Sequence, residues 1–150
     1  MKTQFPIEQF QQLETPFYYY DFDRLDRTLD AVASLAKAYQ YRIHYALKAN
    51  ANIPVLQRIS ARGFGADCVS GYEIRRALET GFHPSDIVFA GVGKADWEIH
   101  LGLDNGIACF NSESIQELQV INGIAAEKGL KAPVALRINP HVDARTHHYI

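Results

Sequence analysis

The segment Tyr41-Arg-Ile-His-Tyr-Ala-Leu-Lys48-Ala-Asn-Ala-Asn52 runs from an apolar, β-type stretch into a single lysine. This pattern predicts a buried strand with Lys48 at its carboxyl end, where little water surrounds the side chain. An ammonium held there loses solvation, so the pKa of the lysine falls and part of it becomes the free amine. A free amine at such a place can capture a carbonyl group. The alternative is a solvated lysine that opens a surface loop, which is the commoner place for this residue type.

From Tyr41 onward, short β-type runs alternate with helical patterns. The predicted strands are Arg42–Leu47, Gly65–Val69, Ile87–Ala90, Ile107–Phe110 and Val134–Asn139. The predicted helices between them are Ile53–Arg62, Gly71–Thr80, Ala95–Leu103 and Glu113–Lys128, with Ser70 and Ser112 as N-caps and Gly63 and Gly129 as C-caps. Repeated β-then-α units predict an α/β fold with a parallel sheet and right-handed crossovers.

The chain before Tyr41 departs from this alternation. Asp23–Tyr39 carries apolar residues at three- and four-residue intervals, which predicts an amphipathic helix. Phe17–Tyr20 follows Pro16 and is dense in β-formers, so it predicts a strand. Because this strand breaks the later rhythm, it could belong to a different sheet.

Two architectures compete for the repeated units. A doubly wound five-stranded sheet would be complete in about 150 residues, whereas a (β/α)8 barrel typically needs about 250. The barrel is favoured because Lys48 stands where a glycine-rich phosphate turn would follow the first strand. It is also favoured because no helix follows the fifth strand before Ile150, which would leave an open edge. We therefore expect the N-terminal part of a (β/α)8 TIM-type barrel, with about five βα strands.

The composition describes a globular chain of 150 residues, 47% hydrophobic and 21% charged, with a formal net charge of -2. No Lys/Arg cluster suggests a nucleic acid or an anionic membrane, and no run of about 18 apolar residues could span a bilayer. Residues 1–8 lack the apolar core of a signal peptide. Cys68 and Cys109 stand far apart in apolar segments, which favours buried thiols in a reducing compartment, with the cytoplasm as the expected location.

Alternation along the first strand puts Lys48 on the same face as His44 and Ala46, while Tyr45 and Leu47 face the helices. His44 is deeper in the strand, a position more typical of a hydrogen-bonded interior histidine than of a catalyst.

Three further residues have either a structural or a functional interpretation. Asp67, near the end of the second strand, is a carboxylate for a cofactor or substrate, or a polar residue at a barrel mouth. Ser70 and Glu73 fit a capping box, which gives Glu73 a structural role. Arg137 lies in an apolar strand and requires a partner, either Glu73 or a cofactor oxygen.

Two other patterns predict no site. Gly91-Val-Gly-Lys94 lacks the spacing of a Walker A phosphate loop and predicts a tight loop with an exposed lysine. A group of metal-ligating residue types stands near the end of the chain: His141, Asp143, His147 and His148. Their spacing matches no tight ligand motif, so no metal site is expected.

Taken together, these motifs resemble those of the pyridoxal phosphate (PLP)-dependent decarboxylases of the alanine-racemase-like barrel class. The resemblance covers about residues 15–150 and runs through Thr15-Pro-Phe-Tyr-Tyr-Tyr-Asp21, His44-Tyr-Ala-Leu-Lys-Ala-Asn50, Gly65-Ala-Asp-Cys-Val-Ser-Gly-Tyr-Glu73, Phe89-Ala-Gly-Val-Gly-Lys94, Phe110-Asn-Ser-Glu-Ser114 and Arg137-Ile-Asn-Pro-His-Val-Asp-Ala-Arg-Thr-His-His-Tyr-Ile150. The last block points to the diaminopimelate decarboxylase branch. Tyr72 stands where many relatives have glycine.

The resemblance implies that Lys48 forms the Schiff base with PLP. Asp67, Glu73 and Arg137 would lie close to the cofactor at the barrel mouth, with His44 among the cofactor-binding residues. The implied reaction converts meso-2,6-diaminopimelate, an amino-acid substrate, into L-lysine and carbon dioxide in a homodimer. Residues 1–22 would be a segment associated with a second, β-rich domain, and residues 23–150 would be an incomplete PLP-binding barrel.

The family's phosphate cradle, the acidic partner of the pyridine nitrogen and a cysteine-containing loop would all fall after Ile150. We therefore expect the 150-residue chain to be inactive by itself. Three alternatives remain open: a PLP barrel decarboxylase for ornithine, arginine or a polyamine precursor such as carboxynorspermidine, a non-catalytic PLP-binding barrel, or a complete doubly wound domain of unrelated role.

Overall fold

The computed structural model describes residues 5–138, 140 and 142. One sheet contains the strands β1 (His44–Ala46), β2 (Gly65–Cys68), β3 (Ile87–Phe89), β4 (Cys109–Ser112) and β5 (Val134–Leu136). The helices are α1 (Ile7–Phe10), α2 (Phe22–Ala38), α3 (Ile53–Ser60), α4 (Gly71–Glu79), α5 (Asp96–Asn105) and α6 (Ile115–Glu127), with short 3-10 helices η1 (Leu47–Ala49) and η2 (Pro84–Asp86). The predicted alternation of strands and helices is therefore confirmed.

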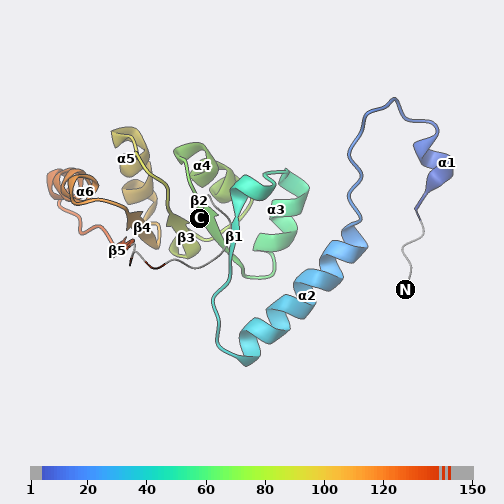
Figure 1. Ribbon diagram of the computed structural model, residues 1–150, viewed down its shortest axis with the longest axis horizontal. Helices are drawn as coiled ribbons and strands as arrows, with labels where there is room; N and C mark the ends of the chain where they lie inside the picture. Colours follow the sequence, from blue (N-terminus) through green and yellow to red (C-terminus); the bar gives the residue numbers. More distant parts are fainter. Residues whose placement is uncertain (1–4, 139, 141, 143–150) are drawn as a thin grey trace.

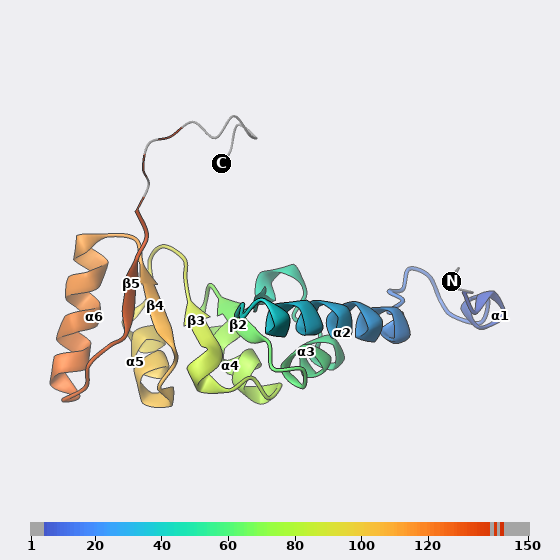
Figure 2. The same ribbon diagram turned by 90° about the horizontal axis from the view of Figure 1, so that it is seen from below.

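The order of the strands decides between the two predicted architectures. Each strand pairs in parallel with the next one in the sequence, giving the order β1-β2-β3-β4-β5. A doubly wound sheet reverses its strand order at a switch point and has helices on both faces. Here the helices from α3 to α6 all lie on the same side of the sheet (Figures 1 and 2). The arrangement is that of consecutive units of a (β/α)8 barrel, and the doubly wound alternative is wrong.

The hydrophobic core lies between the sheet and these helices. Ile87, Phe89 and Phe110 point to the helix side and are almost completely buried, with the centroids of the two phenylalanine rings 6.1 Å apart. Full burial of such a side chain contributes roughly 1.5–3 kcal/mol. Leu47 is fully buried and Tyr45 packs against the same core, so the prediction that both face the helices is confirmed.

The helix ends follow local sequence signals, with one correction. The Ser70 hydroxyl accepts a hydrogen bond from the Glu73 N–H at 3.2 Å, so the predicted cap of α4 is confirmed. The prediction that Ser112 caps α6 is wrong, because β4 continues through Ser112. Ser114 is the cap instead, and its hydroxyl accepts from the Glu117 N–H at 3.1 Å.

The amphipathic helix predicted for Asp23–Tyr39 is confirmed as α2, which packs against α3. Its apolar side includes Leu25, Leu29 and Val32, which contact the core. Its polar side pairs with the turn that follows α3 through Asp30, whose Oδ1 lies 2.6 Å from Nε of Arg62.

The strand predicted for Phe17–Tyr20 is wrong within the described residues, because the segment pairs with no strand there. High β-propensity alone does not form a strand without a partner for its backbone groups. The segment and α1 lie away from the sheet in Figure 1. Their aromatic rings pack on one another, with Phe10 centred 5.3 Å from Phe17 and 4.9 Å from Tyr19.

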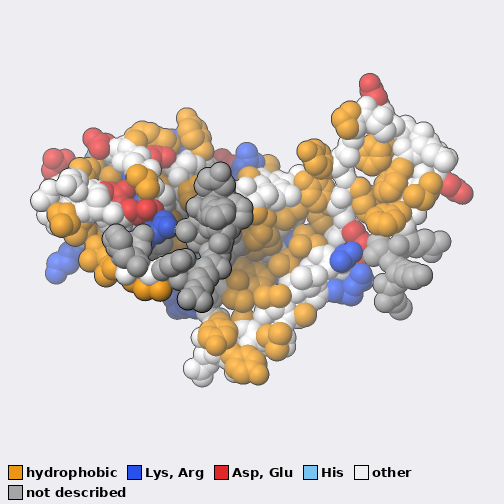
Figure 3. Space-filling model, viewed as in Figure 1, with side chains coloured by type: hydrophobic (Ala, Val, Ile, Leu, Met, Phe, Trp, Pro, Cys, Tyr) orange, Lys and Arg blue, Asp and Glu red, His pale blue; other side chains and the backbone are white. Residues whose placement is uncertain are grey.

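Two of the places where apolar side chains are exposed are the outer edge of β5 and the C-terminal end of α2. At the free edge of the sheet, Val134, Leu136 and Ile138 are 41, 62 and 78% exposed. The other place is the C-terminal end of α2, where hydrophobic side chains gather in Figure 3 and where Tyr39 stacks on Tyr41. Among the described residues, no helix has the length and hydropathy needed to cross a bilayer.

Candidate functional site

Lys48 lies at the carboxyl end of β1, on the turn η1 that packs against β2 and α4. The neighbouring Leu47 is fully buried and anchors this turn in the core. Lys48 itself is exposed, so the prediction that little water surrounds it is wrong for the described residues. The physical reason is local: β1 ends at Ala46, so Lys48 belongs to a turn and no described residue covers it.

Asp67 lies on β2, in register with Ala46 of β1 and Val88 of β3. These residues share the sheet face that is turned away from the helices, because their neighbours Ala66 and Cys68 point into the core. Asp67 is half-buried, and its side chain makes no hydrogen bond or ion pair with another described residue. A carboxylate is therefore available on the face turned away from the helices, on the strand next to the one that precedes the Lys48 turn.

Glu73 has the structural role that the sequence predicted, with a small difference in its partner. Its Oε2 accepts a hydrogen bond from the Val69 N–H at 2.8 Å, one residue before the cap Ser70. The carboxylate thus stabilises the start of α4 and the turn that leaves β2. It makes no ion pair with Arg137, so the predicted Glu73–Arg137 partnership is wrong among the described residues.

The partner of Arg137 is Glu113, at 3.2 Å between Nη1 and Oε1. The register explains this pairing, because the Arg137 N–H donates to the carbonyl of Ser112 at 2.9 Å and so places Arg137 beside Glu113. Arg137 is 72% exposed and borders a cavity of about 260 Å³ that the carboxyl ends of β4 and β5 form with Ala90. Arg137 and Glu113 therefore lie at the same end of the sheet as Lys48.

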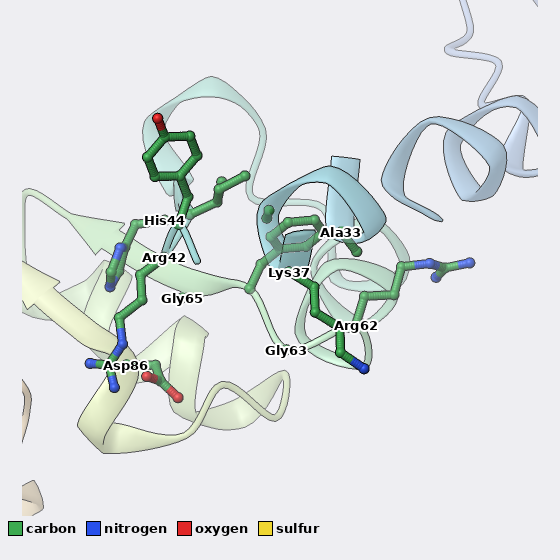
Figure 4. A pocket seen from close by; sticks show the side chains of 12 residues that line it. Ala33, Lys37, Arg42, His44, Arg62, Gly63, Gly65 and Asp86 are labelled. Atoms are coloured by element: carbon green, nitrogen blue, oxygen red, sulfur yellow. The ribbon is translucent and has the colours of Figure 1, made fainter. Parts of the chain in front are cut away.

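His44 is not brought together with the other four residues, because it starts β1 at the opposite, amino end. Its ring packs on Gly65, where a Cβ atom would lie only 2.3 Å from Cδ2 of His44. It lines a cavity of about 350 Å³, and Figure 4 shows Arg42 and Asp86 on the same side of this cavity. His44 is half-buried and its ring makes no hydrogen bond to a described residue, so its predicted interior hydrogen bonding is not observed there.

The sequence prediction missed Lys94, which was expected to be exposed. Its side chain is 1% exposed and pairs with Glu117 at 3.0 Å, between β3 and β4 at the carboxyl end of the sheet. The spacing Ser-x-x-Glu at Ser114–Glu117 was the available signal, since it predicts a carboxylate at the start of α6.

The two cysteines differ in their surroundings. Cys68 is buried, as predicted, and burial together with the nearby carboxylates of Glu73 and Asp67 raises the pKa of its thiol to about 12. Cys109 is only half-buried, and burial raises its pKa as well. Both thiols are therefore poor nucleophiles. The residues weighed as metal ligands, His141, Asp143, His147 and His148, lie outside the described residues.

Known proteins share both the sequence and the fold. The family model described as the pyridoxal binding domain of pyridoxal-dependent decarboxylases matches residues 23–150. The diaminopimelate decarboxylase of Bacteroides thetaiotaomicron is 60% identical over 148 residues, which are 98% of this chain and 38% of the relative. The chain thus spans little more than a third of the length of that curated relative.

Two solved structures are closely similar to this chain. Diaminopimelate decarboxylase from Helicobacter pylori in complex with L-lysine has a TM-score of 0.84 and 45% identity, over 96% of this chain and 36% of that one. The M. jannaschii enzyme in complex with L-lysine has a TM-score of 0.87 and 35% identity, over 96% and 35%. The resemblance to diaminopimelate decarboxylases that the motifs predicted is confirmed, as is the prediction of an N-terminal portion of such an enzyme.

The side chains at the carboxyl end of the sheet fit the cofactor of this family, pyridoxal phosphate. Lys48 has an exposed primary amine, the group that condenses with an aldehyde, and Asp67 and Arg137 carry charges of opposite sign at the same end of the sheet. The chain belongs to the pyridoxal-dependent decarboxylases, because the model of their pyridoxal-binding domain matches residues 23–150.

Proposed function

We propose that this chain takes part in the PLP-dependent decarboxylation of meso-2,6-diaminopimelate to L-lysine and carbon dioxide, the last step of lysine biosynthesis. The similarity to diaminopimelate decarboxylases supports this substrate, since two of the similar enzymes were solved with L-lysine. The chain covers 38% of a curated relative, so the activity is proposed for the whole protein.

One observation carries the proposal. Lys48 stands on a turn at the carboxyl end of β1, with its amine exposed and with Asp67 on the neighbouring strand. Active sites of parallel β/α folds lie at this end of the strands. When bound, pyridoxal phosphate supplies the electron sink that accepts the electron pair released as carbon dioxide leaves.

The candidate site residues at the carboxyl end of the sheet would have separate roles. Lys48 would hold the cofactor covalently through its amine, and the α-amine of the substrate would take the place of the lysine amine on the cofactor, which frees Lys48. Arg137, oriented by Glu113, would place a positive charge beside the cofactor. Asp67 would accept a hydrogen bond from the cofactor. Glu73 would act indirectly, by fixing the turn after β2. His44 lies at the opposite end of β1 and has no role in this proposal.

The remaining expectations concern the whole protein. We expect a homodimer in the cytoplasm, with residues 1–22 associated with a second domain. The 150-residue chain by itself is expected not to turn over substrate, because its free sheet edge and exposed Lys48 leave the site open to water.

The test uses the full-length protein and measures lysine formed from meso-2,6-diaminopimelate in the presence of PLP. Lys48→Ala should lower the rate roughly 10³-fold or more, as removal of a covalent catalytic group does. Lys131→Ala removes an exposed lysine and serves as the matched control, with an unchanged rate.

The same assay separates the alternatives. Faster turnover of ornithine, arginine or carboxynorspermidine would change the substrate but keep the reaction class. PLP binding without turnover of any of these amino acids would indicate a non-catalytic carrier. An unchanged rate in Lys48→Ala would contradict the proposal, and robust PLP-dependent activity of the 150-residue chain would contradict its expected inactivity.

A further inference from the structure

Three consecutive helices carry a glutamate as their third residue: Glu73 in α4, Glu98 in α5 and Glu117 in α6. Each carboxylate accepts a hydrogen bond from a backbone N–H in the loop before its own helix, from Val69 at 2.8 Å, Ala95 at 2.9 Å and Glu113 at 2.9 Å. A carboxylate there also interacts favourably with the helix dipole. The loops at the carboxyl ends of β2, β3 and β4 are therefore fixed in the same way.

Two of these glutamates also reach the neighbouring βα unit. Oε1 of Glu98 accepts from the N–H of Gly71, the first residue of α4, at 2.6 Å. Oε1 of Glu117 accepts from Nζ of Lys94, which lies in the loop before α5, at 3.0 Å. Adjacent units are thus joined at the end of the sheet where Lys48 and Arg137 stand.

Lys94 makes the most extensive of these contacts. Its Nζ donates to the carbonyls of Gly91 and Asn111, both at 2.8 Å, and to Glu117, so its three protons all have acceptors. It also lies 5.2 Å from the centre of the Phe89 ring. Since the side chain is 1% exposed and Glu117 is 10% exposed, removal of either partner would leave a charge with little access to water.

The loop around Lys94 is shaped for this contact. Gly91 and Gly93 have φ angles of 92° and 78°, a left-handed conformation that other residues rarely adopt. The two glycines turn the chain back so that the Lys94 ammonium reaches the carbonyl of Gly91. The Gly-Val-Gly-Lys sequence therefore builds an internal ammonium site between two strands, and the same ammonium holds the end of β4 through Asn111.

The Lys94–Glu117 ion pair is connected to the candidate cofactor site through Glu113 and Arg137. Oε2 of Glu117 accepts a hydrogen bond from the N–H of Glu113. Oε1 of Glu113 in turn accepts a hydrogen bond from Nη1 of Arg137 at 3.2 Å. We propose that Lys94 and Glu117 are positioning residues of the reaction: their buried ion pair fixes the loop of Glu113, which holds Arg137 at the carboxyl end of β5. The role of Arg137 in this inference rests on the proposed function.

The test measures the loop and the cofactor separately in the full-length protein. Lys94→Met keeps the apolar stem and removes the ammonium. We expect hydrogen exchange of a peptide spanning residues 110–117 to become at least about tenfold faster. We also expect the affinity for PLP to fall about tenfold, while the phosphopyridoxyl label on Lys48 after borohydride reduction remains on the same residue. Lys128→Met removes a surface pair with Asp104 and should leave both quantities within about twofold.

A second variant covers the case in which Lys94→Met does not fold. Glu117→Gln keeps an acceptor for the Glu113 N–H but removes the charge beside Lys94, and it should accelerate exchange in the same peptide. Unchanged exchange in whichever variant folds would overturn the positioning role. Faster exchange with unchanged PLP affinity would also overturn it, because the pair would then be structural only. A wild-type protein that binds no PLP would instead contradict the proposed function, and the exchange comparison would still stand.

Discussion

The side-chain amide of Asn50 donates a hydrogen bond to the hydroxyl of Tyr20 at 3.2 Å, and this contact joins the N-terminal segment to the turn that carries Lys48. Asn50 also accepts the Asn52 N–H at 2.9 Å through Oδ1, and its carbonyl accepts the Tyr45 hydroxyl at 3.3 Å. Burial and the nearby Tyr20 raise the pKa of Tyr45, which therefore remains a donor at neutral pH. The turn after Lys48 is thus held from two sides.

Asn50→Ala removes the two side-chain contacts and should lower the free energy of unfolding by about 1 kcal/mol, because partly exposed hydrogen bonds contribute little more than this. Urea unfolding of the full-length protein measures the change. Asn105→Ala is the matched control, since Asn105 is exposed and bonds only within its own helix. Equal stability of the two variants would show that Asn50 does not hold the turn.

Gly71→Ala should be destabilising because a Cβ atom there would lie 2.5 Å from the indole ring of Trp97. Overpacking of this kind typically costs about 1–3 kcal/mol. Gly123→Ala has no atom within 4 Å of the added Cβ and lies inside α6, so it should stabilise by roughly 0.5–1 kcal/mol. Thermal unfolding compares the two variants, and a Gly71→Ala protein as stable as Gly123→Ala would refute the packing argument.

The Glu117 carboxylate should make stability depend on acidic pH. Burial alone would raise its pKa, but the hydrogen bond from the Glu113 N–H and the Lys94 ammonium together lower it below the ordinary value. A lowered folded-state pKa stabilises the protein above the unfolded value of about 4.3, and this stability is lost as pH falls through the folded pKa. The free energy of unfolding, measured with urea from about pH 6 to about pH 3, should fall less steeply with decreasing pH for Glu117→Gln than for the wild type. Parallel slopes would contradict the prediction.

The free edge at β5 should bind hydrophobic dyes in the 150-residue chain, because Leu136 and Ile138 are 62 and 78% exposed. We expect ANS fluorescence to increase when the wild-type chain is added and to increase less when Leu136→Lys is added. Val92→Lys is the control, because Val92 is an apolar residue that is 84% exposed in the loop between β3 and α5. A monodisperse monomer that unfolds cooperatively and binds no ANS would show that the edge is covered in solution.

The features that could be predicted are those that depend on local sequence. The apolar residues of Ile87–Phe89 predict a buried strand, and the spacing of the apolar residues in α2 predicts a helix. The parallel pairing could be predicted because repeated β-then-α units require parallel crossovers. The strand order depended on the choice between a barrel and a doubly wound sheet. The strand predicted at Phe17–Tyr20 failed because propensity does not supply a pairing partner.

The contacts of the candidate site could not be predicted because they depend on register and loop geometry. Arg137 meets Glu113 rather than Glu73 because β5 pairs with β4 in one particular register. Lys94 is buried because acceptors from two βα units surround its ammonium. Lys48 is exposed because β1 ends at Ala46, one residue before the predicted end at Leu47, and sequence alone does not settle a boundary to one residue.

The covalent role of Lys48 can be tested by reducing the full-length protein with borohydride in the presence of PLP and mapping the labelled peptide. We expect one phosphopyridoxyl group on Lys48, and no label in Lys48→Ala. Label on another lysine, such as Lys37 or Lys131, or no label at all under conditions where the protein is folded, would contradict it.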